Sequence, residues 1–524
     1  MKTGRADFYG AAVTLLALSL ALKLLGVAQQ ALLAYLFGAT SELDALLVAV
    51  SVPMLVINIL ASGSLSLAFV PLFSEYYARG QRQKAWFAAS VVANVSVGVA
   101  LMALVVGAAG APTITRWLGP GFDAATHRLT TSLFIILLPT MALAALSAMV
   151  KSVLYFFRRF GPPNAAYVAG NLLLLGVVVW LHQELGVKAV AWGMVLSATV
   201  ALGLQLVVLR GTNPSYHFSF DVRQAGVKQT GLLLLGMTVS IVAMQLNLII
   251  DRAFASNLGE GNVSILEYAA DFDKLIVSTF ALAAAAAIYP TLSDLFSQAR
   301  EQEFADRLTE TVLTVGLAVL PLAAVTLVLR QEIIAIVLQR GHFGPGETEA
   351  VAEVLVHLMP ALVAWAFLYT ALYAFFARRQ SFAPVVVLLA VLAGNAALDA
   401  WLGPLLGVPG LTLATSIVAW GGTATLWTLL LRRVPAMNMR RLVVAMAKIA
   451  LGAMLAGVIC WLVATRMQNA LPAASAMTAL LTTAVSAGCA GLVYALALWL
   501  LRVREAQWLA AWVIQRFRPL SAKT

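Results

Sequence analysis

The chain carries little charge for its length. Only 11% of its 524 residues are charged and 61% are hydrophobic, whereas soluble domains have about 25% charged and about 45–50% apolar residues. The mean hydropathy of +0.91 agrees with this balance. The composition excludes a soluble globular protein and indicates a polytopic membrane protein. The net charge of +11 then reflects topology signals in short loops, so we expect no nucleic-acid partner.

Residues that build metal and redox sites are also scarce. The two cysteines, Cys460 and Cys489, lie in late apolar runs far from any histidine, which argues against a disulfide or a metal site. The five histidines show no metal-ligand spacing, and the sequence has no Gly-rich phosphate loop, nucleophile elbow or paired His/Glu motif. We therefore predict that the protein is not an enzyme and has no cofactor other than a coupling sodium ion or proton.

Long apolar runs are what the chain has in abundance. Fourteen runs reach the length of a membrane-spanning helix, so we predict an all-α polytopic fold. Of the Lys and Arg residues between them, 23 fall on the side of the N-terminus and six on the other side, which places both termini in the cytoplasm. The first run contains Lys23 and is too long for a signal peptide, so we interpret it as a retained span. The predicted spans are 9–37, 43–74, 84–109, 128–157, 163–182, 187–210, 226–256, 264–296, 307–329, 348–377, 382–402, 408–431, 441–465 and 476–501.

The second half of the chain echoes the first. Matching motifs follow one another in order at a nearly constant offset, which predicts an internal duplication. Each copy holds six spans, so the copies share one orientation and should be related by a pseudo-twofold axis along the membrane normal, with a cavity between them. We predict an N-terminal six-helix lobe (1–222), a C-terminal six-helix lobe (223–434) and two additional spans with a cytoplasmic tail (435–524). The pairs include Gly38 with Gly259, Pro71 with Pro290, Pro139 with Pro360, Arg158-Arg159 with Arg378-Arg379, Gly170-Asn171 with Gly394-Asn395 and Gly186 with Gly407.

Charged residues inside the predicted spans mark candidate functional positions, because charge in a membrane is costly. Lys23 lies about 21 Å along the first span at 1.5 Å per residue, too deep to reach the surface easily. We expect it to line a water-filled cavity, and a structural ion pair with Asp271 or Asp273 is the alternative. The other charges are Asp251, Arg252, Glu267, Lys274, Asp399, Lys151 and Lys448.

Asn395 and Asp399 form a candidate cation site. They are four residues apart, so both side chains project from one face of the eleventh span. Thr415 adds a hydroxyl from the next span, and oxygen ligands of this kind suit sodium or a proton-binding carboxylate. If Asp251 faces the same point, the site has two carboxylates. The first copy has Leu175 where Asp399 should fall, which restricts the site to one copy; the alternative is that Asn395 and Asp399 only cap or bridge helices.

Short motifs in both halves match the pattern of a known family. They are Leu24-Leu25-Gly26, Leu36-Phe37-Gly38, Asp44-Ala45, Pro53, Gly63, Ala68-Phe69-Val70-Pro71, Gln245 to Asp251, Phe254-Ala255-Ser256 and Pro290 to Ser293. Together they resemble the MurJ/MviN lipid II flippases of the multidrug/oligosaccharidyl-lipid/polysaccharide exporter superfamily. The resemblance covers essentially the whole chain, including fourteen spans in two six-helix lobes plus two C-terminal helices.

The family resemblance implies a transport cycle by alternating access. A central cavity would take a polyprenyl-diphosphate-linked glycan from the cytoplasmic leaflet and release it outside, while the lipid tail stays in a groove beside the two extra helices. The resemblance places the cation site on Asp251, Asn395, Asp399 and Thr415. We therefore expect a cation-coupled flippase, a monomer in the bacterial inner membrane, with membrane lipids and a lipid-linked glycan as partners and lipid II as the family default.

The substrate positions depart from the family pattern. The family's cavity arginines fall on Lys23, Gln29, Ile57 or Asn58, and Asp271, and its second-helix glutamate falls on Ser62. A diphosphate with about two negative charges would then depend on Lys23, unless Lys274 also faces inward. An exporter of an exopolysaccharide or O-antigen unit, a drug/cation antiporter and a non-transporting envelope scaffold are therefore alternatives. The candidate substrate-cavity residues are Lys23, Gln29, Asp44, Asn58, Ser62, Asp271 and Lys274.

Overall fold

The computed structural model describes residues 3–61, 73–221, 231–470 and 476–507, and these residues form helices without any strand. Within these described ranges, fourteen helical stretches are long and apolar enough to cross a membrane. The all-α fold and the number of spans are therefore confirmed. A helix bonds its own backbone donors and acceptors internally, which is the requirement that an apolar run must meet in lipid.

Contacts divide the chain into two compact units. The first unit comprises Met1–Glu267 with the short loop Arg340–Phe343, and the second comprises Tyr268–Gln339 with Gly344–Thr524. The boundary falls inside the helix α11 (Asn262–Ile276). The lobe boundaries expected at residues 222 and 434 remain predictions.

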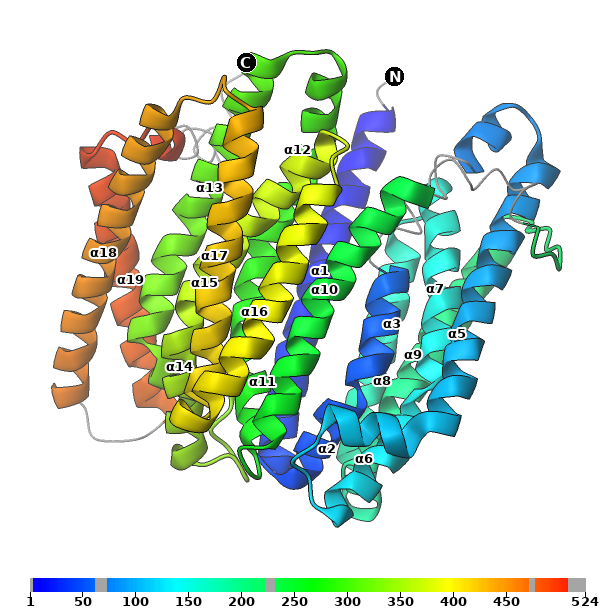
Figure 1. The fold of residues 1–524 in the computed structure, drawn as a ribbon, viewed down its shortest axis with the longest axis horizontal. Coiled ribbons are helices and arrows are strands. Elements are labelled where there is room, and N and C mark those ends of the chain that lie inside the picture. The colour runs from blue at the N-terminus through cyan, green and yellow to red at the C-terminus, as the bar shows by residue number, and fades with distance from the viewer. Residues whose placement is uncertain (1–2, 62–72, 222–230, 471–475, 508–524) are drawn as a thin grey trace. The chain divides into compact units, whose positions relative to one another are not determined.

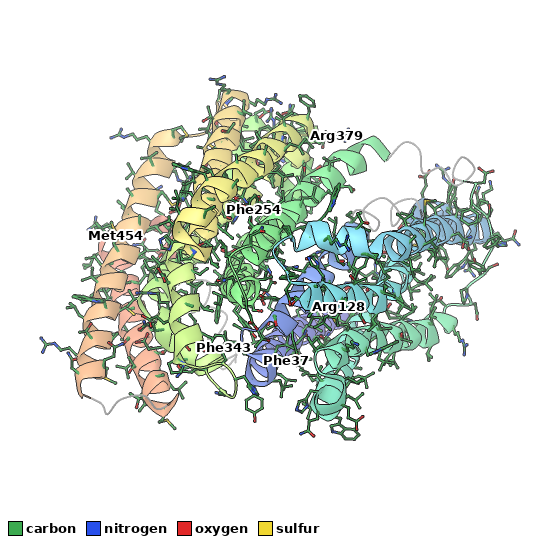
Figure 2. The ribbon with its side chains drawn as sticks, turned by 60° about the horizontal axis from the view of Figure 1, so that its bottom comes forward. Phe37, Arg128, Phe254, Phe343, Arg379 and Met454 are labelled. Carbon is green, nitrogen blue, oxygen red and sulfur yellow. The ribbon has the colours of Figure 1, made fainter. Side chains whose placement is uncertain are left out.

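The first unit is a bundle of long helices (Figure 1). The loop 340–343 belongs to it because His342 N donates to Tyr35 O at the end of the first helix over 3.1 Å, and Figure 2 labels Phe37 and Phe343 on these two segments. The helices are α1 (Thr3–Phe37), α2 (Ser41–Ala49), α3 (Ser51–Ala61), α5 (Arg82–Leu118), α6 (Ala124–Leu137), α7 (Pro139–Phe156), α8 (Gly161–Leu185), α9 (Lys188–Arg210) and α10 (Gly231–Ser256).

The second unit contains the remaining spans. Its last two helices, the predicted addition to the duplication, pack against each other and against α13, where Tyr494 Oη donates to Leu317 O over 2.9 Å. Lys448 Nζ donates to Leu501 O over 2.8 Å, so this intramembrane lysine bonds a carbonyl next to the end of the last helix. The elements are η2 (Val277–Ala281, a π-helix), α12 (Leu282–Ser297), α13 (Glu301–Val328), α14 (Arg330–Val337), α15 (Pro345–Ala377), α16 (Phe382–Leu406), α17 (Val408–Arg433), α18 (Met439–Ala470) and α19 (Ala476–Leu500).

Local backbone geometry repeats between the two copies. Arg158 and Arg379, 221 residues apart, both have positive φ, at 58° and 57°. Gly186 and Gly407, again 221 residues apart, end α8 and α16 with φ/ψ of 55°/−138° and 68°/−147°. The same unusual conformations at the same offset support the predicted duplication.

The fourth span differs from its counterpart in the second copy, the tenth span. The fourth span divides into α6 and α7 directly before Pro139, whereas α15 continues through Pro360 at the matching position. A proline removes one backbone donor and crowds the preceding turn, so a helix either breaks or bends there.

Asp123 caps the N-terminus of α6. Its Oδ1 accepts from Thr126 N over 2.8 Å, and the hydrogen bonds from Thr126 lower the pKa of Asp123.

Candidate functional site

Asn395 and Asp399 form a buried polar pair in the second unit. Both are fully buried, and Asn395 Nδ2 donates to Asp399 Oδ2 over 2.7 Å. The spacing of four residues places them on one face of α16, as predicted. A buried carboxylate is costly unless it is hydrogen-bonded, paired or bound to a cation. The amide therefore stabilises Asp399 inside the helix bundle.

Thr415 lies at the same depth on the neighbouring helix. Asp399 and Thr415 are each eight residues from Gly407, which joins α16 to α17, so both lie about 12 Å from this turn. Thr415 is buried, and its Oγ1 donates to Leu411 O over 3.1 Å. A hydroxyl that donates its proton keeps lone pairs that can accept. Asp399 and Thr415 thus share one level of the hairpin, and Asn395 lies one turn further from Gly407. Their carboxylate, hydroxyl and amide oxygens are hard ligands that suit sodium.

The two copies have a different register from the one expected. α8 and α16 are both 25 residues long, and their last turns end at Gly186 and Gly407, an offset of 221. The pairing of Asn171 with Asn395 needs an offset of 224 and is therefore wrong by about one helical turn. Positions buried in both helices coincide at the smaller offset. These are Pro163 with Pro384, Ala166 with Val387, Gly170 with Val391, Leu174 with Asn395 and Val178 with Asp399.

The corrected register changes the first copy's counterparts of the polar pair. Asn395 matches Leu174, and Asp399 matches Val178 rather than Leu175. Leu174 and Val178 are 3% and 1% exposed, and Asn395 and Asp399 are both 0% exposed. The expectation that one copy lacks the acidic residue holds, but the amide is missing there as well.

Asp251, the fourth predicted cation ligand, lies in the first unit. It is buried in α10, and Asn247 Nδ2 lies 3.5 Å from Asp251 Oδ2. Asn247 was not among the predicted site residues. The signal for it was present, because Asn247 precedes Asp251 by four residues, the spacing that also separates Asn395 from Asp399. Each unit thus contains a buried pair of one Asn and one Asp, and a site that combines ligands of both units remains a prediction.

Arg252, the residue after Asp251, is engaged in a buried ion pair. Its Nε and Nη2 donate to Glu267 Oε2 over 3.1 and 2.7 Å. Its Nη1 donates to Ser51 Oγ over 2.7 Å and to Leu47 O over 2.9 Å. Because both charges are buried, removing either partner would leave the other uncompensated, at a cost of about 3–5 kcal/mol. Arg252 therefore joins α10, α11 and the α2/α3 region of the first unit.

Asp44, a candidate substrate-cavity residue, is fully buried. Its Oδ2 accepts from Gly261 N over 2.7 Å, and its Oδ1 accepts from Ser264 N over 2.7 Å and Ser264 Oγ over 2.5 Å. These are donors at the start of α11, where backbone N–H groups lack partners within the helix. Asp44 thus caps a helix that is distant in sequence. Contact with a substrate remains a prediction for it.

Four other candidates come from the first two predicted spans. Lys23 and Gln29 lie on α1 and Asn58 lies on α3, and all three are half-buried. Ser62 lies outside the described residues. Their assignment to a substrate cavity remains a prediction, as does an ion pair of Lys23 with a carboxylate of α11.

Asp271 and Lys274 neutralise each other on α11. Lys274 Nζ lies 3.1 Å from Asp271 Oδ1, and both side chains are partly exposed. The acidic residue at a position where the family has a basic one therefore adds no net charge, because its own helix supplies the counter-ion. The π-helix η2 follows directly, and π-helical turns occur frequently at functional sites. In the same helix Asp273 Oδ1 is buried without a hydrogen-bond partner among the described residues.

The fold is that of a known class of membrane transporters. It resembles a solved structure of the lipid II flippase MurJ in an inward closed conformation, with a TM-score of 0.75 over 92% of this chain and 98% of that one at 21% identity. It also resembles an inward-facing multidrug resistance MATE family transporter of the MOP superfamily, with a TM-score of 0.66 over 79% and 95% of the two chains at 14% identity. Identities this low establish the shared fold alone.

Sequence comparison identifies the family. The family model described as lipid II flippase MurJ matches residues 33–482, and this chain belongs to that family. A probable lipid II flippase MurJ of Rhizobium tropici is 27% identical over 78% of each chain. The lipid II flippase MurJ of Burkholderia cenocepacia is 25% identical over 79% of this chain and 82% of its own length.

Proposed function

We propose that this protein is a flippase that moves a polyprenyl-diphosphate-linked glycan, with lipid II as the first candidate, from the cytoplasmic to the outer leaflet of the bacterial inner membrane. The observation that carries the proposal is the match to the MurJ family over residues 33–482. Relatives named lipid II flippases, aligned over more than three quarters of this chain, support it. The excess of Lys and Arg on one side supports two cytoplasmic termini.

Cation coupling is the second part of the proposal. Asp399 and Thr415 lie at one level of the α16–α17 hairpin, and Asn395 bonds Asp399 from one turn further along α16. In the first unit Asp251, buried beside Asn247, is a separate candidate carboxylate. Binding a cation would offset the cost of burying a carboxylate. Cation binding would change the charge inside the bundle, so the occupied and the empty site would favour different helix arrangements. This would couple the transport cycle to the ion gradient. We propose that the protein acts as a monomer, since a single chain supplies all fourteen spans.

The charges at the predicted cavity positions bear on the choice of substrate. Lys23 is the one basic residue at the positions where the family carries cavity arginines, and the Asp271–Lys274 pair contributes no net charge there. A less anionic or differently built lipid-linked glycan, such as an exopolysaccharide or O-antigen unit, is therefore the second candidate. A drug/cation antiporter and a non-transporting scaffold follow.

Complementation of a strain depleted of its lipid II flippase tests the assignment. We expect the wild-type chain to restore growth and Lys23→Ala to lose this activity, because the headgroup phosphates then have no basic partner at these positions. Lys23→Arg keeps the charge and should retain activity, which makes it the matched control.

Failure of the wild-type chain despite normal membrane insertion would remove lipid II as the substrate. Full activity of Lys23→Ala would instead overturn the role of Lys23 and leave the substrate assignment in place. Membrane fractions probed for each variant separate both outcomes from poor expression.

A further inference from the structure

The segment that follows α9 has an unusual pattern. Residues 214–221, here called the strap, form neither a helix nor a β-strand, and exposed and half-buried residues alternate along most of them, a pattern typical of an extended chain. Side chains alternate between opposite sides of an extended chain. Polar and aromatic residues alternate along the strap: Ser215, His217 and Ser219 are half-buried, and Tyr216, Phe218 and Phe220 are exposed.

The strap is fastened to the membrane-spanning helix α5 by specific hydrogen bonds. Asn94 Nδ2 donates to His217 O over 3.2 Å and to Ser219 O over 3.0 Å. Tyr216 Oη donates to Asn94 Oδ1 over 2.6 Å, and His217 N donates to Ser90 Oγ over 3.0 Å. Asn94 and Ser90 are both buried. Two polar residues of a membrane helix are thus used to hold an extended segment.

The three aromatic side chains of the strap are largely exposed, although Tyr216 and Phe220 also contact α5. Tyr216, Phe218 and Phe220 are 65%, 78% and 52% exposed, and the rings of Phe218 and Phe220 contact edge to face with centroids 5.3 Å apart. Phe220 lies over Gly98, where an added Cβ would come within 3.6 Å of its ring. Leaving such large rings in water forfeits the free energy of their burial. The strap therefore presents an apolar surface that suits an apolar environment.

The position of the strap along α5 indicates which environment that is. α5 has 37 residues and is about 55 Å long, so it extends beyond a hydrocarbon core of about 30 Å. Its exposed apolar residues include Val99, Met102 and Val105, and they begin just beyond Asn94 and Gly98. The start of the helix carries Arg82 and Lys84. The strap thus lies where the basic end of α5 passes into its lipid-facing surface, and Figure 1 shows it at the outer edge of the first unit, beside α5.

We propose that the strap is a membrane-interface anchor, in which Tyr216, Phe218 and Phe220 insert between the headgroups and acyl chains of the bilayer. Aromatic residues are enriched at this level of membrane proteins, and nearby Lys and Arg favour anionic headgroups. The bilayer is the occupant because the exposed aromatic residues lie beside Gly98, directly before the exposed apolar residues Val99, Met102 and Val105 of a helix long enough to cross a membrane. The anchor also holds the end of α9 and the strap against α5.

Spin labelling in lipid nanodiscs tests the anchor. Cys460 and Cys489 are free thiols and are first replaced by Ala. A nitroxide is then attached at Phe218→Cys, with Gln83→Cys in the first turn of α5 as the aqueous reference and Met102→Cys as the lipid reference. We expect the ratio of oxygen to nickel-chelate accessibility at position 218 to exceed that at position 83 several-fold and to approach or reach that at position 102.

A ratio at position 218 equal to that at position 83 would overturn the proposal. Protection from both reagents would also overturn it, because it would mean that a second copy or another protein covers the strap. Asn94→Ala in the same background tests the attachment: we expect a sharper spectrum at position 218 and a lower lipid accessibility. If Asn94→Ala does not insert, Ser90→Ala removes one of the four bonds and should give a smaller change in the same direction.

Discussion

The α8–α9 hairpin of the first unit and the α16–α17 hairpin of the second have the same backbone and different interiors. Both first helices are 25 residues long, and Gly186 and Gly407 turn the chain with nearly the same φ and ψ. At the depth where one hairpin buries Leu174 and Val178, the other buries Asn395 and Asp399. The scaffold therefore accepts either hydrocarbon or an acid–amide pair at this depth. The polar hairpin is the one to which a coupling role can be assigned.

The largest effect should come from making the polar hairpin resemble the apolar one. We expect Asp399→Val, which introduces the residue of the first copy, to abolish any dependence of transport on sodium or pH, because the carboxylate that changes charge is gone. Initial transport rates in proteoliposomes, measured across sodium concentrations at fixed pH and across pH at fixed sodium, provide the readout. Asn171→Leu is the matched control, since Asn171 Nδ2 donates to Tyr167 O of its own helix. An unchanged ion dependence in Asp399→Val would remove the cation site.

The reverse substitution should give the next largest effect. Val178→Asp buries a carboxylate without a partner in the first unit, and we expect a loss of about 3–5 kcal/mol of stability. Adding Leu174→Asn rebuilds the pair at the same spacing and should recover about 1.5–3 kcal/mol, the value of a hydrogen bond to a charged group. Apparent unfolding midpoints in detergent, compared with Val178→Ile, measure both. A double variant no more stable than Val178→Asp alone would show that the two hairpins are not interchangeable.

The smallest effect should come from changing the glycine turn that the two hairpins share. Gly186→Ala and Gly407→Ala place a side chain where φ is positive and ψ is strongly negative, and we expect each to cost about 1–3 kcal/mol. No neighbouring atom would come closer than 3.8 Å to the added Cβ at either position, so backbone strain alone sets the cost. Gly176→Ala and Gly421→Ala, in helix interiors with open space around them, should be neutral or stabilising by up to about 1 kcal/mol. Clearly unequal losses at Gly186 and Gly407 would contradict the shared turn.

The helices could be predicted from the sequence, but the hydrogen bonds and ion pairs between their side chains could be predicted only in part. An apolar run of spanning length has to be helical, because lipid offers its backbone no other partner. The Asn395–Asp399 pair was predictable because one helix carries both residues. Arg252 and Glu267 were each recognised as unusual, but their pairing depends on how α10 and α11 are rotated. Periodicity in a uniformly apolar sequence does not encode that rotation.

Uncharged residues were the main omission. Asn247 and Asn94 are polar but carry no charge, so a search for intramembrane charge passes over them. Asn94 also binds backbone carbonyls of the strap, and such partners leave no trace in residue identity. The register of the duplication failed for a related reason: a Gly-Asn dipeptide recurs by chance more readily than a pattern of buried positions, which only the packed helices reveal.

Asp44 has a consequence for how the chain is made. Its partners, Gly261 and Ser264, lie 217 and 220 residues further along, and a ribosome working at 5–20 residues per second needs about 10–45 s to reach them. Until then a carboxylate of the second span has no backbone amides to accept from, and it must stay hydrated or protonated near the translocation machinery. The buried hydrogen bonds of Asp44 are therefore completed only after the start of the eighth span has been synthesised.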